Sequence, residues 1–136
     1  MREIKFRAWL KDEKEMIDVK AIDFDENGDV FSVNYPEGKS YSGYDKDEIE
    51  LMQYVGLKDK NGVEIFEGDI VKLWKAKSDD YDSWFEPTRE LKVINFKNGC
   101  FRFGCREFIR YNTCSYELEV IGNIYENKEL LEGREN

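Results

Sequence analysis

The fold of this chain is decided by the stretch Leu57-Lys58-Asp59-Lys60-Asn61-Gly62-Val63-Glu64-Ile65-Phe66-Glu67-Gly68-Asp69-Ile70-Val71-Lys72-Leu73. It contains two turn signals, Asn61-Gly62 and Glu67-Gly68-Asp69. The first predicts a two-residue hairpin turn, because Asn and Gly adopt positive φ most readily at both central positions. The second precedes the apolar run Ile70–Leu73, which predicts a buried strand. Turns and strands this close together are typical of a small, strongly bent β-barrel.

The Asn-Gly signal occurs twice more, at Asn27-Gly28 and Asn98-Gly99, and each occurrence predicts a further hairpin. Ile4–Ala8 alternates apolar and charged residues, which predicts a half-buried strand close to the N-terminus. The apolar runs Ile22–Phe24 and Val30–Val33 flank the first of these turns. The first third of the chain is therefore expected to be an antiparallel meander.

Four segments carry weaker signals. Asn34–Lys46 is rich in Pro, Gly and Ser and is predicted to be a loop. Asp47–Val55 is predicted to be a helical turn that continues into a strand at about Leu51. Lys75–Arg89 is predicted to be a loop, and its length is unusual for a compact domain, where loops of about 4–6 residues are commonest. In the tail 127–136 we expect one short helical turn.

The totals predict a single mainly β domain over residues 1–136. A chain of 136 residues fits one domain, and nine Phe, eight Tyr and three Trp suit a core built on pleated strands. The predicted arrangement is an N-terminal antiparallel meander packed with a small SH3-like bent barrel, with short helical turns only. Residues 1–45 form the N-terminal β-hairpins, 50–126 the β-barrel-like part and 127–136 the tail.

The charge is strongly acidic, with a formal net charge of −9. Between Leu10 and Glu50 there are thirteen acidic and five basic residues, so this region carries most of the excess. A surface of that sign repels phosphate backbones, which disfavours a nucleic-acid partner, and it keeps a small domain in solution. A solvated acidic face is the simplest explanation of the pattern.

Location and metal chemistry are bounded by what the sequence contains. The first residues lack the apolar segment of a signal peptide, and no apolar run approaches the roughly 20 residues that cross a bilayer, so a cytoplasmic protein without a membrane partner is expected. The cysteines Cys100, Cys105 and Cys114 have the spacing C-x₄-C-x₈-C, without a histidine to complete a zinc site. We interpret them as reduced, buried structural thiols and predict no metal and no cofactor.

The chain contains no histidine, which removes the commonest general base at neutral pH and the commonest metal ligand. Carboxylate pairs such as Asp79-Asp80 are numerous only because all acidic residues are numerous. The glycines stand singly and form no phosphate-binding pattern. We predict no catalytic residue and no enzymatic activity, with carboxylate-based catalysis as a third hypothesis.

Two features indicate candidate binding sites. The first is the acidic segment that contains Tyr81, Trp84 and Phe85, where large rings beside carboxylates resemble an interface anchor with a charged rim. The alternative is that Trp84 and Phe85 fold back onto the barrel.

The second feature is a locally basic stretch interleaved with phenylalanines, a composition found in proteins that bind single-stranded nucleic acid. Ordinary strands with charged residues outside and rings inside explain the pattern as well. Its basic residues are Lys92, Lys97, Arg102, Arg106 and Arg110.

Four segments together resemble the YopX family of phage and prophage proteins: Met1–Trp9, Gln53–Gly62, Ile65–Val71 and Val120–Asn127. The chain has Val55 where the family commonly has Thr and Lys128 where Pro is frequent, both at structural positions. The resemblance implies a mainly β fold and an origin on a mobile element in a bacterial host. The family is not tied to an established activity, so the resemblance assigns no catalytic or binding residue.

The leading functional hypothesis is therefore a phage- or prophage-derived cytoplasmic protein that is not an enzyme and acts by binding a protein partner or by forming a homo-oligomer. The alternative is a small β-barrel that binds nucleic acid through the basic and aromatic stretch 92–110.

Overall fold

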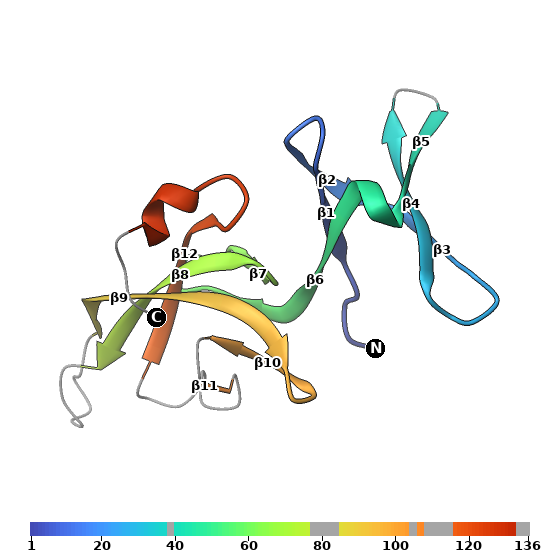
Figure 1. The fold of residues 1–136 in the computed structure, drawn as a ribbon. Helices are drawn as coiled ribbons and strands as arrows, with labels where there is room; N and C mark the ends of the chain where they lie inside the picture. Colours follow the sequence, from blue (N-terminus) through green and yellow to red (C-terminus); the bar gives the residue numbers. More distant parts are fainter. Residues whose placement is uncertain (38–39, 77–84, 104–105, 108–115, 133–136) are drawn as a thin grey trace. The chain divides into compact units, whose positions relative to one another are not determined.

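The computed structural model describes residues 1–37, 40–76, 85–103, 106–107 and 116–132. They form strands joined by turns, and the helical elements among them are two short 3₁₀ turns, η1 and η3 (Figure 1). The prediction of a mainly β protein with short helical turns only is confirmed. By its internal contacts the chain divides into two compact units, Met1–Tyr54 and Val55–Asn136.

The first unit contains two antiparallel three-stranded arrangements, in the orders β2-β1-β6 and β3-β4-β5. The strand β6 begins in this unit and continues into the second. The elements are β1 (Phe6–Leu10), β2 (Glu15–Val19), β3 (Ala21–Phe24), β4 (Val30–Glu37), β5 (Ser40–Asp45), η1 (Lys46–Glu48) and β6 (Ile49–Lys58).

The core of the first unit is built from alternate residues of these strands. Ala8 and Leu10 of β1 are buried together with Val33 of β4 and Ile49 of β6. Successive side chains of a strand point to opposite faces, so burial of every second residue follows directly from the alternation in the sequence. The predicted N-terminal strand and the predicted hairpin around Asn27-Gly28 are both present.

The prediction of a loop over Asn34–Lys46 is wrong, because β4 and β5 form a hairpin there. Gly43 pairs with Asn34, and a Cβ at position 43 would lie 2.8 Å from Asn34 Oδ1, so glycine leaves room for the amide side chain. Pro36 is tolerated because β3 pairs with β4 only as far as Ala21 opposite Asn34, and no third strand needs an N–H at position 36.

The helical turn predicted within Asp47–Val55 is confirmed in η1, and β6 begins at Ile49, just before the expected Leu51.

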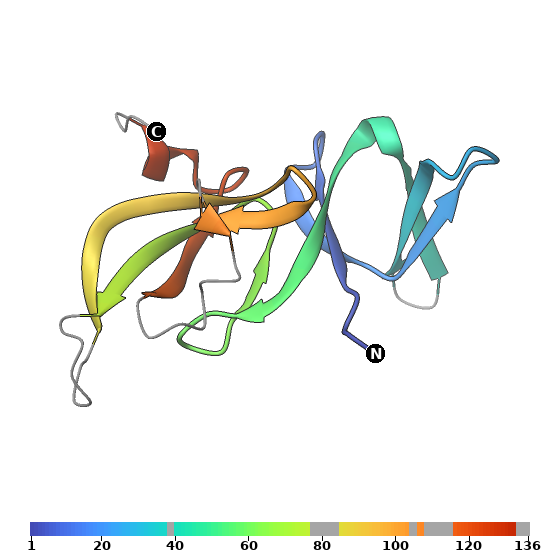
Figure 2. The same cartoon turned by 90° about the horizontal axis from the view of Figure 1, so that it is seen from below.

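The second unit is a curled antiparallel sheet in the order β11-β10-β9-β8-β12. β9 bends strongly along its length in both ribbon views (Figures 1 and 2). The N–H of Lys60 donates to the carbonyl of Leu118 at 2.9 Å, which places the end of β6 beside β12 and curls the sheet towards closure. The elements are β7 (Glu64–Phe66), β8 (Asp69–Ala76), β9 (Phe85–Lys97), β10 (Cys100–Phe103), β11 (Arg106–Glu107), β12 (Tyr116–Asn123) and η3 (Lys128–Leu131).

The concave side of this sheet encloses the second core. Its members are at most 1% exposed, and they come from five different strands of the unit. The central stretch quoted above supplies the largest share, as its apolar pattern predicts. The buried residues are Ile65, Val71, Leu73, Ile94, Phe103 and Leu118.

The turn at Asn98-Gly99 is the predicted two-residue hairpin turn. Lys97 pairs with Cys100, and the two central residues have φ of 55° and 83°. Positive φ at both positions is the geometry that Asn and Gly favour.

The other two Asn-Gly turns are wider than predicted. Asp59 N–H donates to Val63 O at 2.7 Å and Gly62 N–H donates to Asp59 O at 3.1 Å, and only Gly62, with φ of 83°, has a positive φ. The side chain of Asp59 decides the difference, because its Oδ1 accepts the N–H groups of Asn61 and Val63 at 2.8 and 2.9 Å.

Asp25 organises the turn at Asn27-Gly28 in the same way, since its Oδ1 accepts the N–H groups of Asn27 and Asp29. An aspartate two residues before Asn-Gly therefore converts the two-residue turn into a wider loop.

The prediction of a loop over Lys75–Arg89 is also wrong at both ends. Ala76 pairs with Phe85 and Trp74 pairs with Pro87, so β8 and β9 extend into the segment from either side. Residues 77–84 lie outside the part of the chain that the structure describes.

Candidate functional site

The convex face of the sheet formed by β12, β8 and β9 carries the candidate site. Val71 and Leu73 of β8 are buried in the core, so Lys72 and Trp74 point to the opposite face. Glu119 of β12 pairs directly with Lys72 and shares its face. This face therefore carries the charged residues Lys72 and Glu119 at its centre, and the half-buried Trp74 lies beside them.

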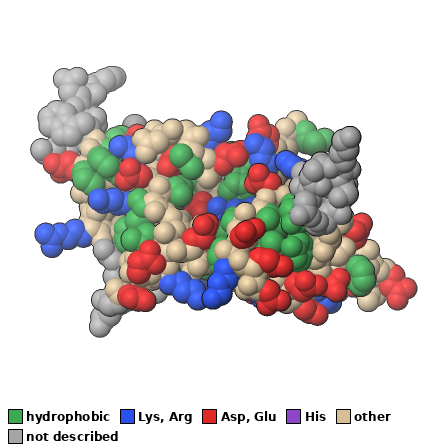
Figure 3. Space-filling model, turned by 90° about the horizontal axis from the view of Figure 1, so that it is seen from above, with side chains coloured by type: hydrophobic (Ala, Val, Ile, Leu, Met, Phe, Trp, Pro, Cys, Tyr) green, Lys and Arg blue, Asp and Glu red, His purple; other side chains and the backbone are tan. Residues whose placement is uncertain are grey.

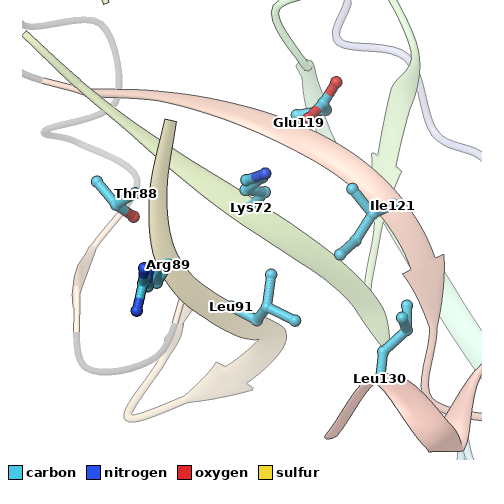
Figure 4. Close-up of a pocket in the computed structure, with 7 residues that line it drawn as sticks. All are labelled: Lys72, Thr88, Arg89, Leu91, Glu119, Ile121 and Leu130. Atoms are coloured by element: carbon cyan, nitrogen blue, oxygen red, sulfur yellow. The ribbon is translucent and has the colours of Figure 1, made fainter. Parts of the chain in front are cut away.

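A groove of about 390 Å³ lies on this face (Figure 4). Lys72 occupies its middle, with side chains of β9 on one side and of β12 on the other. Three of its side chains are aliphatic, two are basic and one is acidic. The lining residues are Lys72, Thr88, Arg89, Leu91, Glu119, Ile121 and Leu130.

An irregularity in the ladder shapes the β9 wall of the groove. The register of β8 against β9 shifts between Lys72 and Trp74. Thr88 Oγ1 donates to the Leu73 carbonyl at 2.8 Å and accepts the Glu90 N–H at 3.1 Å, so the hydroxyl takes the place of a ladder partner. The bulge thereby brings Thr88 and its neighbours on β9 into the groove wall.

A tight turn after β12 shapes the opposite end. The register shifts between Val120 and Gly122, and Ile121, which lies within the shift, lines the groove. The Asn127 side chain folds back under this turn, so closely that a Cβ at Gly122 would lie 2.5 Å from its Oδ1. The chain then enters η3, which adds Leu130 to the groove.

Trp74 lies next to the groove between two charged side chains. Lys60 Nζ is 3.4 Å from the centroid of its ring, and Trp74 Nε1 donates to Glu119 Oε1 at 3.4 Å. The aromatic ring attracts the Lys60 ammonium electrostatically, and the indole N–H donates to the Glu119 carboxylate. Both the apolar ring and the polar N–H of Trp74 therefore have partners. The indole is thus held in one position as part of the surface.

The buried acidic groups of this unit have structural roles. Asp59 is 6% exposed, and its Oδ2 accepts the N–H of Val120 at 2.9 Å in addition to the turn contacts of Oδ1. Asp69 Oδ2 accepts the N–H of Phe66 at 2.8 Å across the Gly68 turn. Among the described residues, no three His, Cys, Asp or Glu side chains gather to hold a metal ion. The chemistry that the groove offers is packing, hydrogen bonding and charge pairing.

The structure describes only part of the predicted aromatic site. Phe85 is the first residue of β9 and is half-buried. Tyr81 and Trp84 lie outside the described residues, so the interface predicted for these three rings stays a prediction.

The basic residues predicted for nucleic-acid binding do not all share a face. Lys92 pairs with the buried Val71 and has the same orientation along β9 as the buried Ile94. Lys97 and Arg102 have the opposite orientation, and Arg102 Nε donates to the Lys97 carbonyl at 3.1 Å.

The remaining members of this stretch are only partly described. Arg106 pairs through its backbone with Phe103, and its side chain and Arg110 lie outside the described residues. On the face shown in Figure 3, Lys and Arg side chains are interspersed with Asp and Glu. Of the cysteines, Cys100 is free and half-buried, and Cys105 and Cys114 are not described.

Sequence reasoning missed the groove and Trp74. One signal was available: along β8 the buried Val71 and Leu73 alternate with Lys72 and Trp74, so a large ring falls on the side that the pattern assigns to solvent. The contributions of Leu91, Ile121 and Leu130 depend on two register shifts and a turn, which the sequence pattern does not indicate.

Comparison with known proteins gives the family. The sequence profile described as YopX protein matches residues 5–132. The chain belongs to the YopX family. Among solved structures, this YopX-family chain is similar to protein EF1440 from Enterococcus faecalis, with 31% sequence identity, a TM-score of 0.63, and coverage of 97% of this chain and 100% of the other. No curated protein matches it.

The segments that carry the YopX resemblance have visible structural tasks. Asp59 and Gly62 build the loop after β6, Asp69 closes the turn before β8, and Gly122 with Asn127 forms the turn after β12. None of the helical segments that the structure describes has the length and hydropathy to cross a bilayer.

Proposed function

We propose that this YopX-family chain is a non-enzymatic interaction module of phage or prophage origin that works in the bacterial cytoplasm by binding a protein partner or a second copy of itself. The observation that carries the proposal is the groove beside Trp74. Protein interfaces often combine an apolar centre, a charged rim and a rigid aromatic side chain. On this face the aliphatic groove residues, the charged Lys72, Arg89 and Glu119, and Trp74 supply these features.

The chemistry of the groove supports binding over catalysis. It contains one carboxylate, Glu119, whose Oε1 accepts the Trp74 indole N–H. The hydroxyl of Thr88 is engaged within the β8–β9 bulge. The sequence contains no histidine that would serve as a general base.

A double substitution at the groove tests the proposal. Lys72→Glu with Leu91→Asp is expected to weaken self-association or partner binding by about tenfold or more, because it reverses the central charge and removes apolar contact area. Size-exclusion chromatography with light scattering measures self-association, and pull-down from host lysate followed by titration of the captured protein measures partner binding.

Lys75→Glu is the control for the lysine reversal, because Lys75 is exposed on the same strand and its substitution changes the charge as Lys72→Glu does. The control is expected to behave as the unsubstituted protein, and circular dichroism checks that all variants are folded. Association that survives the groove substitutions, or a strict monomer that captures nothing, would contradict the proposal.

The second candidate function is binding of single-stranded nucleic acid at the tip of the β9–β10 hairpin. Phe96 is 55% exposed and packs edge-on against Phe101, with ring centroids 5.0 Å apart, and Lys97 and Arg102 are close in sequence. An exposed ring can stack on bases, and basic side chains elsewhere on the same hairpin attract the phosphates. The net charge of −9 opposes this function.

Fluorescence anisotropy with labelled oligothymidine at low salt measures this second function. If it operates, changing Arg102 and Arg106 to alanine together should reduce affinity and flatten its salt dependence. Phe96→Ala should reduce affinity without changing the salt dependence, because it removes stacking and leaves the charge. Absence of binding at low salt would eliminate this function.

A further inference from the structure

The state of Lys72 suggests what the groove binds. Its side chain is half-buried in the groove, and it makes no ion pair or hydrogen bond with any described residue. Glu119 pairs with it across the strands but directs Oε1 to the Trp74 indole N–H. An ammonium that is partly removed from water and makes no direct ion pair gains from an incoming carboxylate.

The other half of the groove is aliphatic. Leu91 from β9, Ile121 from β12 and Leu130 from η3 converge on the end away from Thr88 (Figure 4). A volume of about 390 Å³ is at the low end of the roughly 300–1,000 Å³ of ligand sites. The space is large enough for one or two branched aliphatic side chains, and its lining matches them in polarity.

The chain itself places a segment of matching chemistry at one end of the groove. Leu130 belongs to the sequence Glu129-Leu130-Leu131-Glu132, in which two leucines stand between two glutamates. Its leucine is the part that lines the groove. An aliphatic side chain with acidic residues nearby in the sequence thus already packs at this groove.

We propose that the groove binds an acidic, aliphatic segment of a protein partner, with an aliphatic side chain against Leu91, Ile121 and Leu130 and an adjacent carboxylate paired with Lys72. This inference rests on the proposed function and specifies the partner's chemistry. A basic segment would bring its cations against Lys72 and Arg89. A neutral segment would leave Lys72 without a direct ion pair.

Titration of the ¹⁵N-labelled full chain with capped synthetic peptides tests the inference. The probe has the order Gly-Glu-Leu-Leu-Glu-Gly, and the charge-reversed control has Lys in place of each Glu. The acidic peptide is expected to shift the amide resonances of Lys72, Leu91 and Ile121, with an affinity that falls as salt is added. The basic peptide is expected to bind at least about fivefold more weakly.

Two matched variants locate the charge. Lys72→Met keeps the aliphatic stem and should weaken the acidic peptide by about fivefold, whereas Lys75→Met on the same strand should leave its affinity unchanged. Equal affinities for both peptides, or an affinity for the acidic peptide that Lys72→Met does not change, would contradict the proposal that the partner segment is acidic. Shifts of the same resonances with protein concentration alone would identify a second copy as the occupant and would also overturn it.

The two proposals fail in different ways. If the acidic peptide does not bind, but Lys72→Glu with Leu91→Asp still abolishes association, the groove is the interface and the assigned partner chemistry is wrong. If association is indifferent to that double substitution, the proposed function itself is wrong.

Discussion

Replacing Asp59 by alanine is expected to lower the free energy of unfolding of the C-terminal unit by about 3 kcal/mol. The carboxylate is 6% exposed and accepts three backbone N–H groups, from Asn61, Val63 and Val120. Alanine leaves these donors without their acceptor, and the Val120 donor lies within β12, where water has the least access. Urea denaturation followed by circular dichroism and tryptophan fluorescence measures the loss.

Asp25 provides a matched control for this substitution. It occupies the same position in a loop of the same design and accepts two N–H groups, but among the described residues its side chain has no hydrogen bond to a distant strand. Asp25→Ala is expected to cost about 1 kcal/mol, the usual value for a partly exposed turn cap. The loss for Asp59→Asn should fall between those for Asp59→Ala and Asp25→Ala. The amide keeps one oxygen as an acceptor, but it places an NH₂ group against the N–H that the other carboxylate oxygen accepted. Equal losses at positions 25 and 59 would show that the bond to Val120 contributes nothing.

Phe103→Ala is expected to lower the free energy of unfolding by about 4 kcal/mol, which is more than the loss expected for Asp59→Ala. Phe103 is 0% exposed and is the largest of the fully buried side chains, paired with the buried Ile94 on the neighbouring strand. Removing the ring forfeits its burial and leaves a cavity that the strands around it cannot close.

Phe96→Ala is the control, because Phe96 lies on the same face of the same hairpin but is 55% exposed. Its removal should cost about 1 kcal/mol, mainly through the edge-on contact with Phe101. Urea midpoints of the two variants, measured side by side, give the comparison. Similar losses would mean that the core does not centre on Phe103.

The sequence predicts the strands well where one face is buried. Ala8 and Leu10 alternate with Arg7 and Trp9, and Val71 and Leu73 alternate with Lys72 and Trp74. The structure buries Ala8, Leu10, Val71 and Leu73 and leaves the residues between them partly exposed. The same reasoning fails over Asn34–Lys46, because Pro and Gly do not interrupt the paired strands there. Pro36 lies beyond the end of β3, and Gly43 makes room for Asn34, so both are compatible with pairing.

The groove was beyond sequence reasoning for a different reason. Leu91, Lys72 and Glu119 come from three strands and meet only because the ladder sets them in register. One residue of slip would move each of them to the other face. The hydroxyl of Thr88 and the packing of Asn127 under Gly122 fix that register, and both are details of side-chain geometry that hydrophobic alternation does not encode.

The three Asn-Gly turns also bear on where asparagine deamidation is expected in this protein. Asparagine is lost when the backbone nitrogen of the following residue attacks its side-chain carbonyl and displaces ammonia, and water then opens the resulting succinimide to aspartate or isoaspartate. A following glycine has no Cβ and hinders this attack least. In two of the turns that nitrogen is already committed, because Gly28 donates to Asp25 O and Gly62 donates to Asp59 O. Within the described residues the amide of Gly99 has no such backbone partner. We therefore expect deamidation during storage to be faster at Asn98, at the exposed hairpin tip, than at Asn61 in the loop after β6.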